Sequence, residues 1–556
     1  MTPGIRQAYP MQERPERLSM SRRPSSTTGT PNLASDGADQ QDAKLPKYIR
    51  ALKDGTGQPL PGRTIIVCLD GTGDKFDGDN TNIVHLVSCF KKSDPNQICY
   101  YQSGIGTYDG SGLQKGFSAA MDLAVASGLG VHIRGAYHFL MQNYHENDRI
   151  CIFGFSRGAY TARCLAGMVH KVGLLPAHNI EQIDFAYQYY KDDSEEGWKM
   201  SGDFKRTFCM DVSVYFIGVF DSVASVGFIP RTLPLSSTPF NKAVYFRHAM
   251  SLDEHRAKFK VKQFEAKDSI QPDSHWESVA ELHEHARPGV PAASFSPDLG
   301  AEDFAKDDDD TASQAGAAAP MPHMTRRQRM QHAEETDVLE VWFAGAHADV
   351  GGGAVPNEER HKLSQIPLRW MIRQCFECNT GIIFNVHHLA EEGLDVHTLW
   401  PAYSSLGIPN LGPSPSWFER KQTQAIPPIT GRASVLKPID ESLLDVQIWK
   451  DEDKGILHHE WVPEQVEDYF DALSPINDQL IQARMWWILE YWPITIRVQH
   501  AGSDEWVKEV SINLGRYRAV QGRRPNLHWT VQQRMEAAGY KIQARLARHS
   551  AWRVVA

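Results

Sequence analysis

The stretch from Arg149 to Arg163 constrains the fold of this chain more than any other. An apolar, partly β-branched run passes into Gly154-Phe-Ser156-Arg-Gly158 and then directly into an Ala-rich, helix-forming segment. A strand that turns sharply into a helix needs small residues two positions before and after the serine, because the two backbones must approach closely there. The pattern predicts a strand-turn-helix element that holds the Ser156 hydroxyl clear of a sheet.

Short apolar runs alternate with helical stretches from residue 61 onward. This alternation is typical of an α/β fold, with a mostly parallel sheet and crossover helices on both faces. The nearly continuous apolar runs fit strands that are covered on both faces. We expect strands at 64–69, 97–102, 149–153, 213–220, 243–248 and 338–344, and helices at 81–92, 116–144, 157–172 and 363–378.

Composition divides the chain into four parts. Residues 1–58 are rich in Pro, Ser, Gln and Asp, and we expect a disordered N-terminal tail. A catalytic domain follows at 59–400, interrupted by a low-complexity surface insertion at about 268–336. Residues 401–556 form an aromatic-rich region that packs on or caps this domain. Within this region, the sequence at 474–492 predicts a helix that packs in the core or lines a pocket. The alternative is that this helix contacts lipid or substrate.

Charge and cysteine usage exclude several classes of protein. The net charge of −10 gives no basic surface for nucleic acid. No run of 18 apolar residues predicts a transmembrane segment, and the N-terminus lacks the apolar core of a secretory signal. Eight scattered cysteines suit a reducing compartment, so we expect a cytoplasmic protein. Cys375 and Cys378 form a lone CxxC that favours packing, and we predict neither a metal site nor a cofactor.

A catalytic serine requires a base and an acid that orients the base. Asp221 follows the apolar run 214–220, and His347 follows 339–345. Both would reach the same sheet edge as Ser156, in the chain order Ser, Asp, His that α/β-hydrolases use. Asp221 and His347 are preferred because each follows a strongly apolar strand. The alternative for these two residues is that the aspartate only forms a turn and the histidine has a structural role. The rivals are the acids Asp70, Asp253 and Asp349 and the bases His248 and His255.

An oxyanion hole needs two backbone N–H donors. The residue after the nucleophile, Arg157, supplies one of them. We expect the second from the loop after the first strand, at Gly71 and Thr72, where Asp70 would orient the turn. We expect Asp349 to support the site beside His347. The loop 104–112 is rich in glycine but matches no nucleotide-binding motif, so we expect it to form a wall of the active site.

Five motifs together resemble a known family. They are LDGT at 69–72, YQSGIGT at 101–107, GFSRGAY at 154–160, GVFDSVA at 218–224 and WFAGAHADVGGG at 342–353. The chain resembles the uncharacterised α/β-hydrolase family known as domain of unknown function 2235, which also contains the catalytic domain of phospholipase effectors of bacterial type VI secretion. It is most similar to the eukaryotic, typically fungal branch.

This resemblance covers about residues 62–265 and 336–375. It implies an α/β-hydrolase fold and a triad that falls on Ser156, Asp221 and His347. It also implies ester hydrolysis, with phospholipid as the substrate class of the effector branch.

The leading hypothesis is a serine hydrolase that cleaves a carboxylic ester of a small molecule or lipid through an acyl-enzyme on Ser156. Peripheral contact with a membrane is compatible with it, and the oligomeric state stays open. Two alternatives remain. One is a catalytically inactive scaffold on a hydrolase core, and the other is a thioesterase or amidase that uses the same triad.

Overall fold

The computed structural model describes most of the chain after residue 44. The described residues are 45–54, 60–71, 74, 76–104, 119–223, 243–264, 336–409, 462–500 and 506–556. The predicted N-terminal tail up to residue 44, nearly all of the predicted insertion at 268–336, and residues 105–112 of the predicted loop at 104–112 lie outside them.

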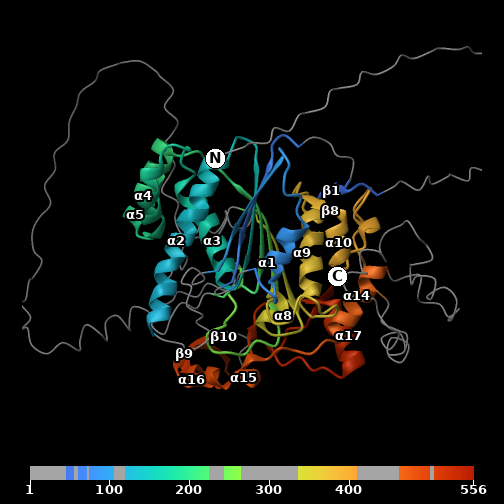
Figure 1. Cartoon of the computed structure of the whole chain (residues 1–556). Coiled ribbons are helices and arrows are strands. Elements are labelled where there is room, and N and C mark those ends of the chain that lie inside the picture. The colour runs from blue at the N-terminus through green and yellow to red at the C-terminus, as the bar shows by residue number, and fades with distance from the viewer. Residues whose placement is uncertain are drawn as a thin grey trace, which may run out of the picture. The chain divides into compact units, whose positions relative to one another are not determined.

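A single eight-stranded sheet forms the centre of the described structure (Figure 1). Its strand order is β14-β12-β7-β6-β5-β4-β2-β3, and every neighbouring pair is parallel. Six of the strands were predicted from the sequence, so the α/β fold class is confirmed. The strands are β2 (Thr64–Leu69), β3 (Gln97–Gln102), β4 (Arg149–Phe155), β5 (Val214–Phe220), β6 (Ala243–Ser251), β7 (Asp337–Phe343), β12 (Asn526–His528) and β14 (Arg553–Val555).

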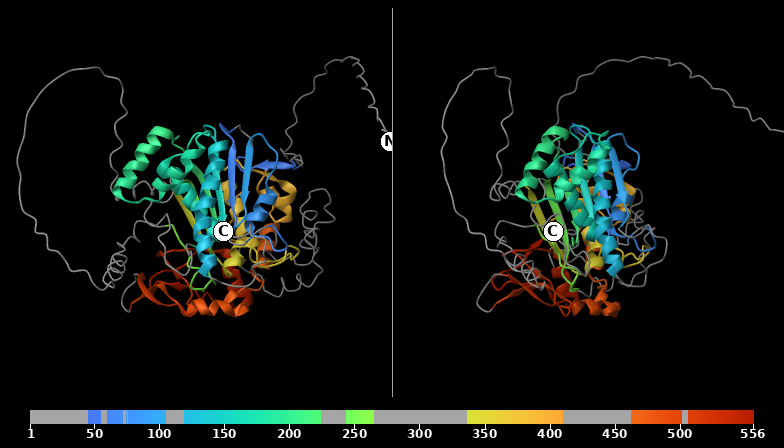
Figure 2. Two further views of the ribbon diagram at one scale, coloured as in Figure 1. Left: turned by 60° about the vertical axis from the view of Figure 1, so that its left-hand side comes forward. Right: turned by 90° about the vertical axis from the view of Figure 1, so that its left-hand side faces the viewer.

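Helices cover both faces of this sheet, as Figures 1 and 2 show. On one face lie α2 (Ala119–Asn143), α3 (Ser156–Val172), α4 (Ile183–Lys191) and α5 (Glu195–Phe208). On the other face lie α1 (Asn82–Cys89), α9 (Gln365–Glu377) and α10 (Val386–Glu391). The four helices predicted from the sequence correspond to α1, α2, α3 and α9.

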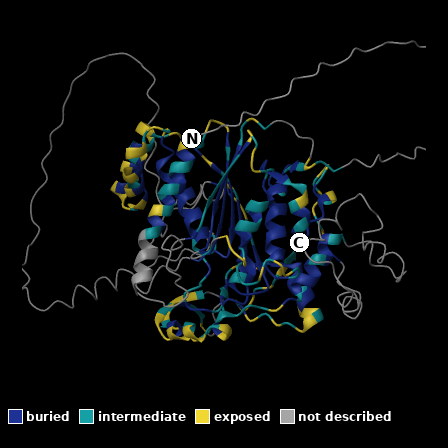
Figure 3. Cartoon of the chain, viewed as in Figure 1, coloured by how far each residue is buried: buried dark blue, intermediate teal, exposed yellow. Residues whose placement is uncertain are grey.

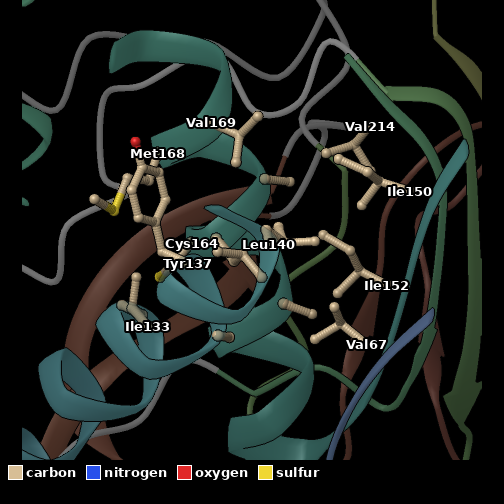
Figure 4. Packing of buried hydrophobic residues seen from close by; sticks show 14 of the residues in the cluster. Val67, Ile133, Tyr137, Leu140, Ile150, Ile152, Cys164, Met168, Val169 and Val214 are labelled. Carbon is tan, nitrogen blue, oxygen red and sulfur yellow. The ribbon is translucent and has the colours of Figure 1, made fainter. Parts of the chain in front are cut away.

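The alternation of side chains along each strand explains why the strands read as continuous apolar runs. In β2, Ile65 and Val67 pack into the core beneath α2 and α3, whereas Ile66 and Cys68 pack into the core beneath α1 and α9. Figure 4 shows the first of these cores, with side chains from α2 and α3 against β2, β4 and β5. Figure 3 shows that burial is concentrated in the sheet and in the helix faces that lie on it. Two buried faces therefore hold the sheet rigidly in the middle of the domain.

The folded structure begins earlier than the predicted boundary at residue 59. Strand β1 (Tyr48–Arg50) pairs antiparallel with β8 (Ile383–Asn385), and Ile49 is buried in the core that includes α9. The prediction of disorder for the whole of 1–58 is therefore wrong for residues 48–50. The polar composition of the first 58 residues hid this short strand, in which only Ile49 is buried.

The C-terminal region contributes to the central sheet itself. Strand β12 pairs with β7, and β14 pairs with β12. The same region contains α14 (Pro463–Ala472), α17 (Trp529–Ala538), the antiparallel hairpin of β9 (Pro493–Gln499) and β10 (Trp506–Ile512), and the short pair β11 (Ala519–Val520) and β13 (Arg545–Leu546). Outside this region, short 3-10 helices lie at Ile180–Gln182 and Val396–Thr398.

The expected single helix at 474–492 is wrong. The chain forms three short turns there, α15 (Gln479–Gln482), η5 (Arg484–Trp486) and α16 (Trp487–Glu490). Ala483 separates the first two with an extended backbone, at φ −125° and ψ 84°. Several large apolar side chains of this segment face solvent, so the expected packed-core helix is also wrong.

In the part of the chain that the structure describes, no helix is both long enough and apolar enough to cross a membrane.

Candidate active site

The strand-turn-helix element forms as the sequence predicted. Strand β4 ends at Phe155 and α3 begins at Ser156, whose φ of 57° is a strained value for a residue with a side chain. A Cβ atom on Gly158 would lie 2.2 Å from the carbonyl oxygen of Leu69, and one on Gly154 would lie 2.6 Å from the carbonyl oxygen of Gly158. Only glycine fits at either position, and the close approach fixes the serine at the carboxyl edge of the sheet.

Three side chains meet at this edge. Asp221 follows β5, the strand next to β4, and His347 begins the short helix α8 (His347–Gly351) after β7. The Nε2 atom of His347 lies 2.7 Å from Oγ of Ser156, and its Nδ1 atom lies 2.6 Å from Oδ2 of Asp221. With the proton on Nδ1, the imidazole donates to Asp221 and accepts from the Ser156 hydroxyl. All three residues are buried. The structure therefore brings together the three residues proposed as a triad.

Asp221 has further partners that sequence reasoning missed. Ser251, the last residue of β6, donates its N–H to Oδ1 at 3.0 Å and its hydroxyl to Oδ2 at 3.1 Å. Arg518, from the C-terminal region, donates to both carboxylate oxygens. No local pattern marks Arg518, since it is 297 residues from Asp221 in the sequence.

The electrostatic setting keeps the acid charged and the base neutral. Burial raises the pKa of the Asp221 carboxyl, but the charge of Arg518 and the hydrogen bond from His347 outweigh burial, so this pKa lies well below its usual range. Burial lowers the pKa of His347, and it outweighs the opposing effect of Asp221. A neutral imidazole is the form that accepts a proton from a serine.

Aromatic rings and an ion pair enclose His347. Phe155 and Phe259 each place a ring centroid 4.8 Å from the imidazole centroid. Glu254 accepts from the backbone N–H of His347 at 3.3 Å and forms a buried ion pair with Arg256, which lowers the pKa of Glu254 to about 2 against the opposing effect of burial. These contacts fix the orientation of the ring and keep bulk water from it.

The proposed oxyanion donors are only partly described. Arg157 is the second residue of α3, so its N–H lies in the first turn of that helix, where backbone N–H groups lack helical partners. The Gly71 N–H donates to Oδ1 of Asp70 at 2.8 Å and is therefore already paired. Thr72 lies outside the described residues, so its role stays a prediction.

Asp70 makes the contacts of a residue that orients a turn. Its carboxylate accepts from the hydroxyls of Thr81 and Tyr101, both at 2.8 Å, besides the N–H of Gly71. These bonds join the end of β2 to α1 and β3. That Asp70 supports the site and takes no direct part in catalysis therefore remains a prediction.

Asp349 lies on α8, two residues after His347. Its carboxylate accepts the N–H of Ala346 at 2.9 Å and both the N–H and the side-chain amide of Asn477, at 2.9 and 2.7 Å. Burial raises the pKa of Asp349 to about 6. These bonds tie the start of α8 to the C-terminal region, which fits the supporting role predicted for Asp349.

The rival residues have partners elsewhere. Asp253 accepts from the N–H of Gly345 at 2.7 Å and from the hydroxyl of Tyr540. His248 accepts from the N–H of Ser222 and contacts Glu340, and His255 contacts Asp478 and the carbonyl of Gly515. None of these contacts is with Ser156. Across the described ranges, no group of three or more His, Cys, Asp or Glu side chains could hold a metal ion.

Fold and site together define the class: an α/β protein with a serine, a histidine and an aspartate hydrogen-bonded in series at the carboxyl edge of a parallel sheet. Residues 63–374 match the family model described as type VI secretion system (T6SS), phospholipase effector Tle1-like, catalytic domain. The chain belongs to this family, which confirms the resemblance drawn from the sequence motifs and supports hydrolase activity.

Individual proteins are similar over different lengths. An uncharacterised protein of Saccharomyces cerevisiae, YEL023C, is 29% identical over 569 residues, covering 85% of this chain and 79% of its own. An uncharacterised protein from Pseudomonas aeruginosa with a crystal structure is 16% identical in sequence, with a TM-score of 0.27. The match covers 58% of this chain and 47% of that protein. The Tle1 effector bound to the VgrG spike of the type VI secretion system is 17% identical with a TM-score of 0.27, covering 54% of each chain. This chain thus spans about half the length of either solved protein.

Proposed function

We propose that this protein is a serine hydrolase that cleaves a carboxylic ester of a phospholipid through an acyl-enzyme on Ser156. The observation that carries the proposal is the series of hydrogen bonds from Ser156 through His347 to Asp221. The family supports it, since the matching model describes the catalytic domain of phospholipase effectors. No cofactor takes part in the proposed chemistry.

In the first half of the reaction, Oγ of Ser156 attacks the ester carbonyl carbon while its proton passes to Nε2 of His347. Asp221 accepts the hydrogen bond from Nδ1 and stabilises the imidazolium that forms. The carbonyl oxygen becomes an oxyanion, which the backbone N–H of Arg157 stabilises together with a donor from the loop after β2. A single donor of this kind contributes about 10²–10³ in rate.

In the second half, the tetrahedral intermediate collapses and the alcohol leaves with the proton from His347. Water then attacks the acyl-enzyme, and its proton passes to the same imidazole. The second tetrahedral intermediate releases the free acid as Ser156 recovers its proton. Because His347 acts as a base and then as an acid in each half of the reaction, it changes charge four times in each cycle.

An exposed apolar surface next to the site favours a lipid substrate. Six side chains in the turns after α14 form what we call the 481–492 apolar face: Ile481, Met485, Trp487, Ile488, Tyr491 and Trp492. Exposed fractions of 75% for Ile481, 69% for Met485 and 64% for Ile488 are unusual for such residues in a single cluster. Tryptophan and tyrosine beside aliphatic side chains suit the boundary between lipid headgroups and acyl chains.

This face is connected to the catalytic histidine by two aromatic contacts. The ring of Trp486 lies edge-on to Phe259 at 5.3 Å, and Phe259 lies edge-on to His347 at 4.8 Å. Within the same segment Arg484 is exposed, whereas Glu490 is buried. An apolar surface that carries an exposed arginine is complementary to anionic phospholipids. We propose that the 481–492 apolar face binds the surface of a lipid membrane peripherally and so brings the site to its substrate.

Comparing wild type with Ser156→Ala tests this function on three substrates: phospholipid vesicles, a long-chain ester and a short water-soluble ester. We expect release of fatty acid from vesicles by the wild type and a loss of at least about 10³-fold in Ser156→Ala. Ser88→Ala is the matched control, because Ser88 lies in α1, where its hydroxyl donates to the His85 carbonyl, and its described contacts include no residue of the proposed triad. Equal rates in wild type and Ser156→Ala would overturn the proposal.

The same assay, extended to a thioester and an amide substrate, separates the alternatives. Faster hydrolysis of the thioester or amide than of the esters would identify a thioesterase or amidase that uses the same residues. Preference for the short ester, with no action on vesicles, would remove the lipid part of the proposal. A folded wild type without activity on any of these substrates would favour an inactive hydrolase scaffold.

A further inference from the structure

A buried arginine from the C-terminal region pairs with the proposed triad carboxylate. Nη1 of Arg518 lies 2.6 Å from Oδ1 of Asp221, and Nη2 lies 2.9 Å from Oδ2. Both side chains are almost completely buried, at 2% and 0% exposure. The planar fork of a guanidinium fixes a carboxylate in two directions at once, which a single donor cannot do.

Arg518 is itself held by the segment around the site. Its Nη1 donates to the hydroxyl and the carbonyl of Ser251, at 2.7 and 3.0 Å, and its Nε donates to the carbonyl of Phe259 at 3.1 Å. Phe259 in turn packs its ring against His347. One side chain therefore links the acid of the proposed triad to a ring that orients the base.

The position of Arg518 also alters the charge that His347 meets. An unpaired Asp221 would attract a proton to the imidazole strongly, whereas the neighbouring guanidinium, with its opposite charge, offsets part of that attraction. The other charged groups that face His347 are Glu254 and Arg256, which pair with each other after β6. Among the described residues that contact Asp221, Arg518 is thus the only one with a permanent positive charge.

A lysine stands nearby without adding a second fixed charge. The Lys260 ammonium donates to the side-chain oxygen of Asn513 at 2.6 Å. Burial, followed by the charge of Arg518, lowers the pKa of Lys260 to about 7. Its charge is therefore partial near neutral pH, which leaves Arg518 as the permanent counter-ion of Asp221.

We propose that Arg518 is a positioning residue of the hydrolytic site, which fixes the angle of the Asp221 carboxylate and offsets its charge, and so controls how readily His347 takes up a proton. This inference rests on the proposed function. It makes the C-terminal region part of the catalytic machinery, because the site lacks its counter-ion without Arg518.

Two substitutions separate the geometric effect of Arg518 from its charge. Arg518→Met removes the charge, so the imidazolium of His347 gains stability and the acidic limb of the pH profile of kcat/KM should move upward by about one pH unit. The kcat should fall by roughly ten- to a hundredfold, the usual loss when a partner that orients a catalytic ligand is removed. Arg518→Lys keeps the charge but loses the fork, so the limb should stay in place while kcat falls at least several-fold.

Arg369 provides the matched control. It lies in α9, is equally buried and pairs with Asp468 and Asp471 of α14, and its described contacts include no residue of the proposed triad. Arg369→Met and Arg369→Lys should lower the melting temperature as the Arg518 variants do, but they should leave the acidic limb unchanged. Rates are expressed per folded molecule, with the folded fraction measured by circular dichroism.

The inference is overturned if folded Arg518→Met keeps the wild-type acidic limb and the wild-type kcat. If Arg518→Met does not fold, Arg518→Lys decides alone, and a wild-type kcat in that variant overturns the inference. An NMR titration of His347, labelled at the imidazole carbon, gives a readout independent of turnover. A wild type without Ser156-dependent activity would contradict the proposed function, whereas an unshifted His347 titration in Arg518→Met would contradict this inference.

Discussion

Oγ of Ser156 lies 2.7 Å from Nε2 of His347, although 191 residues separate them in the sequence. The serine stands on a strained turn after β4, and the histidine begins a short helix after β7. Neither position is maintained by its immediate neighbours alone, because each depends on the parallel register of the sheet. The contact is therefore a consequence of the fold, and it is the geometry that a general base requires.

Replacing Asp221 by Asn should lower both the catalytic rate and the stability of the fold. The amide cannot stabilise an imidazolium, so kcat should fall by about 10³–10⁴-fold, as in other enzymes with such a triad. Arg518 would lose its buried counter-ion, which should lower the free energy of unfolding by about 3–5 kcal/mol. Kinetics and urea denaturation test the two effects separately. A folded variant with more than a tenth of the wild-type kcat would contradict the role of Asp221.

The pH dependence of kcat/KM should show an acidic limb below the ordinary histidine pKa. In the proposed mechanism His347 acts as a base only when it is neutral, and burial lowers its pKa below the ordinary histidine value. Lowering the pH from 7 to about 6.5 should therefore cost less than half of the activity, and the larger loss should come at lower pH. A limb centred above 6.5 would indicate that the imidazole is not shielded as described.

The 481–492 apolar face should matter for vesicles and not for soluble esters. The double variant Met485→Ser/Ile488→Ser should weaken vesicle binding by at least about tenfold, since burying one large apolar side chain contributes about 1.5–3 kcal/mol. Hydrolysis of a short soluble ester should stay near the wild-type rate. Phe185→Ser is the control, because Phe185 is 49% exposed on α4, at the opposite end of the domain in Figure 1. Equal vesicle binding by both variants and wild type would remove this face from the account.

Glycine substitutions should show that the turn at Ser156 is sterically fixed. Gly158→Ala would place a Cβ atom 2.2 Å from the Leu69 carbonyl oxygen, so the variant should unfold at lower denaturant or fail to fold. Gly202→Ala is the control, because Gly202 lies in the helix α5 with no atom within 4 Å of its Cβ position. That variant should be more stable by about 0.5–1 kcal/mol. Similar unfolding midpoints for both would contradict the close packing of strand and helix.

Much of the site could be predicted because its residues stand at the ends of apolar strands. Asp221 follows β5 and His347 follows β7, so their positions were visible in the local pattern of the sequence. The carboxyl ends of parallel strands share one edge, which brings such residues together without knowledge of the tertiary structure.

The remaining parts of the site depend on contacts that leave no local signal. Arg518 and Asn477 reach the site from the C-terminal region, and nothing in their neighbouring sequence distinguishes them from surface residues. The aromatic segment 474–492 was placed wrongly for a related reason. Its composition gives the amount of apolar surface, but the break at Ala483 and the exposure of Met485 and Ile488 depend on tertiary packing.

Covalent trapping of Ser156 tests the central claim most directly. Wild type, Ser156→Ala and Ser88→Ala are treated with a fluorophosphonate probe, and the modified peptide is identified by mass spectrometry. We predict a single adduct on Ser156 in wild type and in Ser88→Ala, and none in Ser156→Ala, with all three proteins folded. Undiminished labelling of Ser156→Ala, or an adduct on a different residue in the wild type, would contradict the assignment of Ser156 as the nucleophile.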